Sequence, residues 1–331
     1  MNITAAQVNE LRQMTGAGMM DCKKALVECN GDKEAAIDYL RKKGQKIAEK
    51  RADREAAEGA VISATTADHT YGAVIMLNCE TDFVGSNADF VGAAKGFLQA
   101  AIDNKIQNLD ALKAFAINGR TVADLVTDLT AKTGEKVELK HLEVVEAPYV
   151  ANYNHQGNRL ATLVGFNKSF NGIEETAHEV AMHAAAMSPI AIDENDVPQE
   201  TKDREMAVAI EKTKQEQAAK AVDVALKKAG INPAHVDSED HINSNMAKGW
   251  ITEAQAQQAR EIREKVTADT LANLKEQMVM NIANGRVNKF FKENCLLDQA
   301  SLLDGSMTVR QFIQKADKDA TVTAFKRVQL G

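Results

Sequence analysis

The residues of this sequence that could do chemistry are, first, its histidines and cysteines. His178 and His183 stand on a predicted helix with Glu179 between them, which resembles the zinc-binding helix of metalloproteases. That chemistry needs two histidines four residues apart on one helical face. Here the spacing is five residues, so the rings point roughly 140° apart around a helix and cannot share an ion. Two ordinary histidines on the surface of a helix are the better interpretation.

No other pattern predicts a catalytic or metal centre. The remaining histidines are dispersed, and Cys22, Cys29, Cys79 and Cys295 lack the paired spacing of a metal site, which favours free thiols. The turn Thr15-Gly16-Ala17-Gly18 resembles part of a phosphate loop, but no strand precedes it, so a break between two helices is favoured. The sequence has neither a nucleophile elbow nor a Walker-type loop. We therefore expect no metal, no cofactor and no covalent catalysis.

One stretch places a carboxylate beside a bulky aromatic ring: Asn78-Cys79-Glu80-Thr81-Asp82-Phe83-Val84. Asp82 and Phe83 fall on a short connection between a predicted strand and a predicted helix, where structure requires neither side chain. In one interpretation, Phe83 or Val84 folds back against the next helix as a hydrophobic staple. In the other, Phe83 is exposed and contacts a partner. The pattern alone leaves both interpretations open.

The elements on both sides must position this stretch. A half-buried strand before it is predicted by apolar residues at every second position: Tyr71, Ala73, Ile75 and Leu77. After it, Ser86 with Asp89 predicts the start of a helix. One apolar stripe follows along that helix: Phe90, Ala94, Phe97 and Ala101. A further helix from Thr121 to Gly134 and a strand over 137–145, bulged near His141, complete this α+β unit.

The chain as a whole predicts an α+β class fold. Residues 1–44 predict three short helices whose inner face includes Val8, Leu11 and Met14, and the third helix is expected to end at Gly44. A charged linker over 45–56 follows. The core subdomains are predicted as a duplicated pair, each a small antiparallel sheet with helices, because a hairpin followed by a helix occurs twice. Their residues are 57–147 for the first, and 148–197 with 284–331 for the second.

Residues 198–283 differ in character from both subdomains. They are rich in Ala, Lys and Gln and carry only a thin apolar stripe, which predicts a long helical hairpin with a polar tip over 230–250. We expect this inserted hairpin to project as a solvated arm. Such an arm usually serves as a contact surface or a dimerisation device.

Composition excludes several classes of protein. The 331 residues are 44% hydrophobic and 26% charged, which is ordinary for a globular protein, and the length suffices for two or three domains. A net charge of -7 argues against a direct nucleic-acid binder, whose affinity comes mainly from neutralising phosphates. No apolar run is long enough for a membrane span, and the start Met-Asn-Ile-Thr is unlike a secretory leader. A cytoplasmic location is expected.

Two motifs are similar to those of one family. The segment 11–26, Leu-Arg-Gln-Met-Thr-Gly-Ala-Gly-Met-Met-Asp-Cys-Lys-Lys-Ala-Leu, resembles the opening of bacterial elongation factor Ts. Residues 78–84 resemble the core motif of the same family. Four later blocks fit it in the same order along nearly the whole chain: residues 181–185, 284–286, 295–299 and 308–309.

The resemblance implies a guanine-nucleotide exchange factor for elongation factor Tu, and no covalent chemistry. It implies an N-terminal three-helix domain like the ubiquitin-associated (UBA) domain, a two-part α+β core and a coiled-coil hairpin. The expected partner is elongation factor Tu in its GDP-bound and nucleotide-free states. An alternative is a protein-binding scaffold without exchange activity. A hydrolase built on the histidine helix and Cys79 fails on spacing and lacks a recognisable base.

The resemblance also implies which residues meet the partner. Asp82 and Phe83, flanked by Thr81 and Val84, would enter beside the magnesium and phosphate side of its nucleotide pocket; we call residues 81–84 the wedge. Three further residues would face its nucleotide-binding domain (Arg12, Met19 and Met20), unless Met19 or Met20 is simply a core residue. His155 would meet its third domain, unless it is only a turn histidine.

This chain departs from the family pattern at two places. Its hairpin is longer than usual, so contacts at the tip, residues 232–250, cannot be carried over. The sequence ends at Gly331, without the extra C-terminal helical module of some members, so contacts of that module are not expected.

Overall fold

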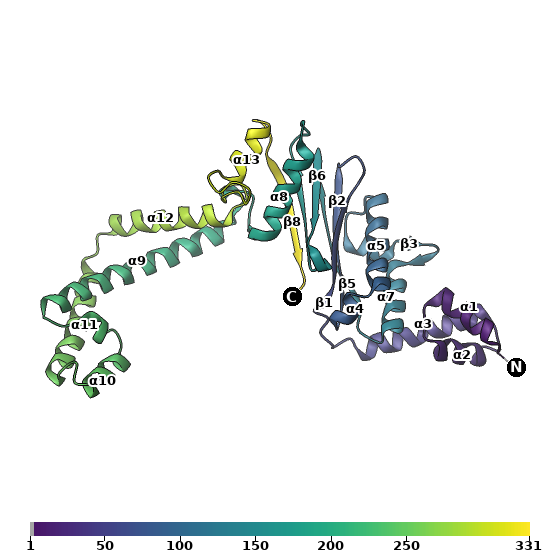
Figure 1. The fold of residues 1–331 in the computed structure, drawn as a ribbon, viewed down its shortest axis with the longest axis horizontal. Coiled ribbons are helices and arrows are strands. Elements are labelled where there is room, and N and C mark those ends of the chain that lie inside the picture. Colours follow the sequence, from purple (N-terminus) through teal and green to yellow (C-terminus); the bar gives the residue numbers. More distant parts are fainter. Residues whose placement is uncertain (1–2) are drawn as a thin grey trace. The chain divides into compact units, whose positions relative to one another are not determined.

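Two β-hairpins and two later strands form a pair of three-stranded antiparallel sheets (Figure 1). The first sheet has the strand order β1-β2-β5, from strands Glu58–Thr65, Tyr71–Cys79 and Glu138–Glu146. The second has the order β6-β7-β8, from strands Tyr149–Asn154, Leu160–Phe166 and Val322–Gln329. In each sheet the second strand of the hairpin lies in the centre and pairs with a strand that follows a helix. This repeated order confirms the predicted duplication and the α+β class.

The structure, a computed structural model, describes residues 3–331. Its contacts divide the chain into two units: the first reaches to Ile192 and resumes over Leu296–Gly331, and the second is Asp193–Cys295. The predicted arm, residues 198–283, lies inside the second unit. No helix among the described residues combines the length and the apolarity that a membrane crossing demands.

Strand β2 is buried along its whole length, so the prediction of a half-buried strand is wrong. Tyr71, Ile75 and Leu77 belong to a core shared with helix α5 (Ala88–Asp103). On the opposite face, Val74 and Met76 belong to a second core together with residues of the other sheet: Val150, Ala161, Leu163 and Val328. The alternate residues of β2 are apolar as well, so the strand serves two cores at once.

Helices cover the outer face of each sheet (Figure 1). The first sheet packs against α5, α6 (Leu109–Ala114) and α7 (Val122–Thr133), and a short β3–β4 hairpin (Ala116–Ile117 with Arg120–Thr121) precedes α7. The second packs against α8 (Ile173–Met187) and α13 (Val309–Ala316). The predicted bulge is confirmed, since Met76 pairs with His141 while Leu77 pairs with Leu139. The predicted start at Ser86 is wrong by one residue, because the Asn87 side chain caps α5.

The N-terminal helices are α1 (Ala5–Thr15), α2 (Met19–Glu28) and α3 (Lys33–Lys50). Val8 and Leu11 are buried as expected, but Met14 is 57% exposed, so its assignment to the inner face is wrong. Helix α3 also continues beyond Gly44, where we expected it to end. The reason is packing: a Cβ on Gly44 would lie 2.9 Å from the Ala131 Cβ, so the glycine lets α3 approach α7 closely. The residues expected to open a linker are therefore the last turns of a helix.

The second unit is helical, with α9 (Gln199–Lys228), α10 (Glu239–Ala247), α11 (Glu253–Asn273) and α12 (Glu276–Asn294). The second arm of the predicted hairpin is two helices, α11 and α12, with a break at Leu274–Lys275 that the apolar spacing does not indicate. Residues 284–294 continue α12 instead of returning to the globular pattern. The tip is not merely polar, because it holds an apolar cluster of its own: Leu226, Ile231, Val236, Ile242 and Ile251.

We predict that the first unit folds without the second. The chain leaves at Ile192 and returns at Leu296, and these ends are joined by backbone hydrogen bonds, from Leu296 N to Ala191 O and from Leu297 N to Ile192 O, each 2.9 Å. Replacing residues 194–294 with a short Gly/Ser linker should therefore leave cooperative thermal unfolding, because closing a short loop costs little entropy. Aggregation or loss of cooperativity in calorimetry would show that the second unit is part of the core.

Candidate functional site

The wedge forms a short helix, α4 (Asp82–Gly85), directly after β2. Thr81 caps it by accepting a hydrogen bond from the amide of Val84. Phe83 is 85% exposed, so the staple interpretation is wrong for this residue. Val84 is instead half-buried and packs against the core of the first sheet. The site therefore presents an aromatic ring to solvent beside the exposed carboxylate of Asp82.

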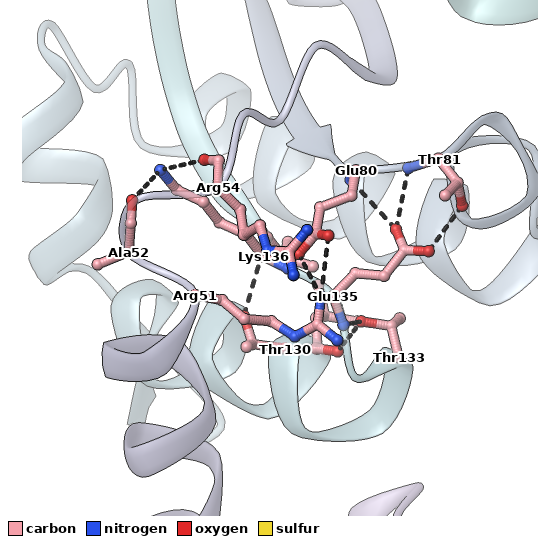
Figure 2. Close-up of polar contacts among 11 residues, drawn as sticks. Arg51, Ala52, Arg54, Glu80, Thr81, Thr130, Thr133, Glu135 and Lys136 are labelled. Carbon is pink, nitrogen blue, oxygen red and sulfur yellow. Dashed lines mark hydrogen bonds and ion pairs between the residues drawn. The ribbon is translucent and has the colours of Figure 1, made fainter.

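The Glu135 carboxylate holds the start of α4 (Figure 2). It accepts hydrogen bonds from the amides of Glu80 (3.1 Å) and Thr81 (3.0 Å), and from the Thr81 hydroxyl (2.7 Å). Hydrogen bonds to an ionised carboxylate are stronger than those between neutral groups. Glu135 follows the end of α7, so two elements far apart in the sequence fix the direction in which Phe83 points.

A close backbone contact seats the other end of α4. Gly85 is buried, and a Cβ added there would lie 3.0 Å from both the amide nitrogen and the carbonyl oxygen of Gly59 at the start of β1. Even an alanine at this position would force the backbones of α4 and β1 apart by a few tenths of an ångström. The helix that bears Phe83 is therefore held by core contacts at both of its ends, Thr81 and Gly85.

Cys79 is unsuited to nucleophilic chemistry. Its thiol is buried and lies 3.1 Å from the Thr81 carbonyl oxygen, to which it donates. Burial raises the pKa of the thiol to about 12. Nucleophilic cysteines need the opposite shift, since the thiolate is the reactive form. The residue completes the core beneath the wedge.

The two histidines of α8 differ from each other. His178 is exposed and lies edge-on to the Tyr153 ring, with centroids 5.8 Å apart. His183 is buried, with its Nε2 2.9 Å from Gln299 Oε1, so its assignment as a surface histidine is wrong. Burial lowers the pKa of His183 below its ordinary value. Within residues 3–331 no cluster of three or more His, Cys, Asp or Glu side chains could hold a metal ion.

The candidate docking residues of the N-terminal helices are exposed. Met19 and Met20, at the start of α2, are 54% and 75% exposed, so the core interpretation is wrong for both. They line a groove between α1 and α2 together with Ile3 and Val8. Arg12 is also exposed, in the last turn of α1, but does not line this groove.

His155 is exposed in the turn between β6 and β7, where its Nδ1 lies 3.0 Å from the Tyr153 hydroxyl. This turn and α4 are neighbours. Arg159, just after the turn, forms an ion pair of 2.5 Å with Glu58. Hydrogen bonding to Glu58 raises the pKa of Arg159, and Asp82 is close enough for its charge to add to the rise. The structure thus brings the His155 hairpin and the wedge to one region.

Sequence reasoning missed Glu135 and the Gly59–Gly85 contact. No local pattern could reveal them, because Glu135 is 54 residues from its partner Thr81 and Gly59 meets Gly85 only through the fold. The exposure of Phe83 was one of two open interpretations, and the structure selects it.

Comparisons with known proteins agree on one family. The family model "Elongation factor TS" matches residues 80–222 and 206–331, and "UBA/TS-N domain" matches residues 3–40. Proteins named elongation factor Ts are similar over their whole length. The protein from Phocaeicola vulgatus is 53% identical over 331 residues, covering 100% of this chain and 99% of that relative. Those from Flavobacterium psychrophilum and Porphyromonas gingivalis are 40% and 36% identical, each with at least 99% of both chains covered.

We predict opposite stability effects for two phenylalanines seven residues apart. Phe83→Ala should change the free energy of unfolding by less than about 0.5 kcal/mol, because the ring is exposed. Phe90→Ala, the matched control, should cost about 3–5 kcal/mol, because that ring is 2% exposed and its removal leaves a cavity. Urea unfolding of both variants measures this. Similar losses for the two would mean that Phe83 packs in solution.

His183 should make stability depend on pH. Since burial holds its folded pKa below that of the unfolded chain, the unfolded state takes up the proton first. The contribution is complete above the unfolded pKa of about 6.5 and is lost as pH falls below it. Urea unfolding at several pH values between 7.5 and 5.5 measures this. The free energy of unfolding should fall less with pH in His183→Gln than in the unchanged chain, because glutamine does not titrate but keeps a donor towards Gln299. Identical pH profiles for the two proteins would show that His183 does not cause the pH dependence.

Proposed function

This chain belongs to the elongation factor Ts family, and we propose on that premise that it is a guanine-nucleotide exchange factor for elongation factor Tu. It would bind the GDP-bound partner, promote GDP release and leave when GTP fills the site. No covalent bond is made or broken in such a reaction. A protein that binds the nucleotide-free state more tightly than the loaded state accelerates release by that difference in affinity.

The observation that carries this proposal is the exposed Phe83 ring on a short helix that core contacts hold at both ends. A ring that is 85% exposed in the free chain contributes little to folding, so its free energy of burial is available for a partner. Both ends of α4 are fixed, through Glu135 and through Gly59, so little entropy is lost when the ring is inserted. The Phe83 ring is thus already placed for contact with a partner before binding.

We propose that the wedge acts on the magnesium and phosphate side of the partner's pocket. Phe83 would push between the elements that close this side, and the Asp82 carboxylate would repel the phosphates and disturb the groups around magnesium. Weaker magnesium coordination weakens phosphate binding, because the ion neutralises much of the phosphate charge. GDP then leaves, and abundant GTP replaces it.

The other exposed residues would supply affinity. Met19 and Met20 line an apolar groove, and such flexible side chains suit a protein contact. Arg12 would add a charged contact at the same module. His155, on the hairpin beside the wedge, would meet the third domain of the partner.

A protein-binding scaffold without exchange activity is the alternative. Both proposals use the same exposed surfaces, so only kinetics separates them. Release of labelled GDP from elongation factor Tu, with and without this chain, is the deciding measurement. Binding without faster release would favour the scaffold.

We predict that Phe83→Ala and Asp82→Ala slow the stimulated release of GDP. Loss of even ~2 kcal/mol of contact that forms only in the exchange-competent complex corresponds to roughly a thirtyfold lower rate. Leu303→Ala, which shortens another exposed apolar side chain (57%), is the control and should exchange normally. If folded Phe83→Ala protein accelerated release as well as the unchanged chain, the wedge would not be the exchange element.

A further inference from the structure

Besides His155, the proposed partner contacts lie on the N-terminal helices and on α4, both in the first unit. Between them run α3 and residues 51–56, the stretch expected to be a charged linker. This stretch is tied to the core beside the wedge (Figure 2). Arg51 Nη1 lies 2.7 Å and 2.8 Å from the two carboxylate oxygens of Glu80. The Lys136 ammonium donates to the carbonyl oxygens of Ala52 (2.8 Å) and Arg54 (3.1 Å).

One carboxylate joins the two halves of this network. Glu80 Oε1 also accepts a hydrogen bond of 2.6 Å from the amide of Lys136. The Glu80 side chain is only 15% exposed, and that of Arg51 is 35% exposed, so water screens this ion pair less than a surface pair. The hydrogen bond from Lys136 and the guanidinium of Arg51 both lower the pKa of Glu80, so the carboxylate stays charged at neutral pH.

Glu80 and Lys136 are the sequence neighbours of the pair that holds α4. Thr81 donates to Glu135, while Glu80 binds Arg51 and Lys136 binds residues 52 and 54. The junction between β2 and α4 is thus the same place at which α3 is anchored. The close packing of Gly44 on α7 fixes α3 a second time. The contacts that anchor the end of α3 and those that hold the start of α4 therefore involve adjacent residues of the same junction.

We propose that Arg51, Glu80 and Lys136 are positioning residues that set the spacing between the N-terminal docking groove and the wedge. This inference rests on the proposed exchange function. When one partner is gripped at two points, binding at the first raises the effective concentration of the second, provided that the spacing fits. If a flexible stretch replaced this network, the distance between the groove and the wedge would vary widely. The effective concentration of the second contact would then be lower. Contact at the groove would then no longer drive Phe83 into place.

The test compares Arg51→Ala in two backgrounds, using the full chain and nucleotide-free or GDP-bound elongation factor Tu. In the otherwise unchanged chain, Arg51→Ala should lower the affinity and the kcat/KM of GDP release about tenfold. In a chain with Met19→Ala and Met20→Ala, where the groove contact is already lost, it should lower them less than twofold. Arg51→Lys, which keeps the charge, should restore part of the loss. Lys50→Ala, at the exposed neighbouring position, should have no effect in either background.

A merely structural role for Arg51 predicts a different pattern. If its loss only disordered α4, release would fall equally in both backgrounds, which would overturn the inference. An unchanged kcat/KM in the first background would overturn it as well. Hydrogen–deuterium exchange of the free chain gives an independent reading: Arg51→Ala should speed exchange over residues 47–56 and leave α5 unchanged. No change over residues 47–56 would contradict the anchoring.

Failure of the exchange proposal would be seen separately. If the unchanged chain binds the partner but does not accelerate release, calorimetric affinities in the same two backgrounds still decide whether the spacing matters. If it does not bind, the inference falls with the function.

Discussion

Burial of β2 on both of its faces is the constraint on which the rest of the structure depends. One face of the strand meets α5, and the other meets the second sheet. The strand therefore cannot shift or rotate without exposing one of two cores. Cys79 is its last residue and is itself buried, so the point at which the chain leaves the core is fixed. Glu80 and the wedge follow directly in the chain, so the position of α4 depends on the position of this strand end.

Much of the fold could be predicted from local patterns. The helix start at Thr121 and the apolar stripe from Phe90 to Ala101 mark α7 and α5 where the structure has them. Errors occurred where tertiary packing outweighed local preference. Gly44 allows close helix packing and does not end a helix. The second face of β2 is buried by the other sheet, and the sequence of β2 alone cannot show that this sheet packs there.

The candidate site was predictable only in part, for the same reason. The composition of residues 78–84 indicated an unusual connection, and a family resemblance indicated which side chains would act. Whether Phe83 packed inward depended on what else filled the core, and Val84 occupies that place. The groups that hold the wedge come from Glu135 and Gly59, and only the folded chain brings them to it.

Exposure of Phe83 in the free chain and its burial by the partner can be tested directly at that position. The chain has a single tryptophan, Trp250. A variant with both Trp250→Phe and Phe83→Trp can therefore carry one 5-fluorotryptophan, at position 83, for fluorine NMR. The unlabelled partner gives no fluorine signal. We predict a large solvent-isotope shift for the free chain, which disappears on binding nucleotide-free elongation factor Tu and returns when excess GDP dissociates the complex. A fluorine already shielded from solvent in the free chain, or one still exposed in the complex, would contradict this prediction.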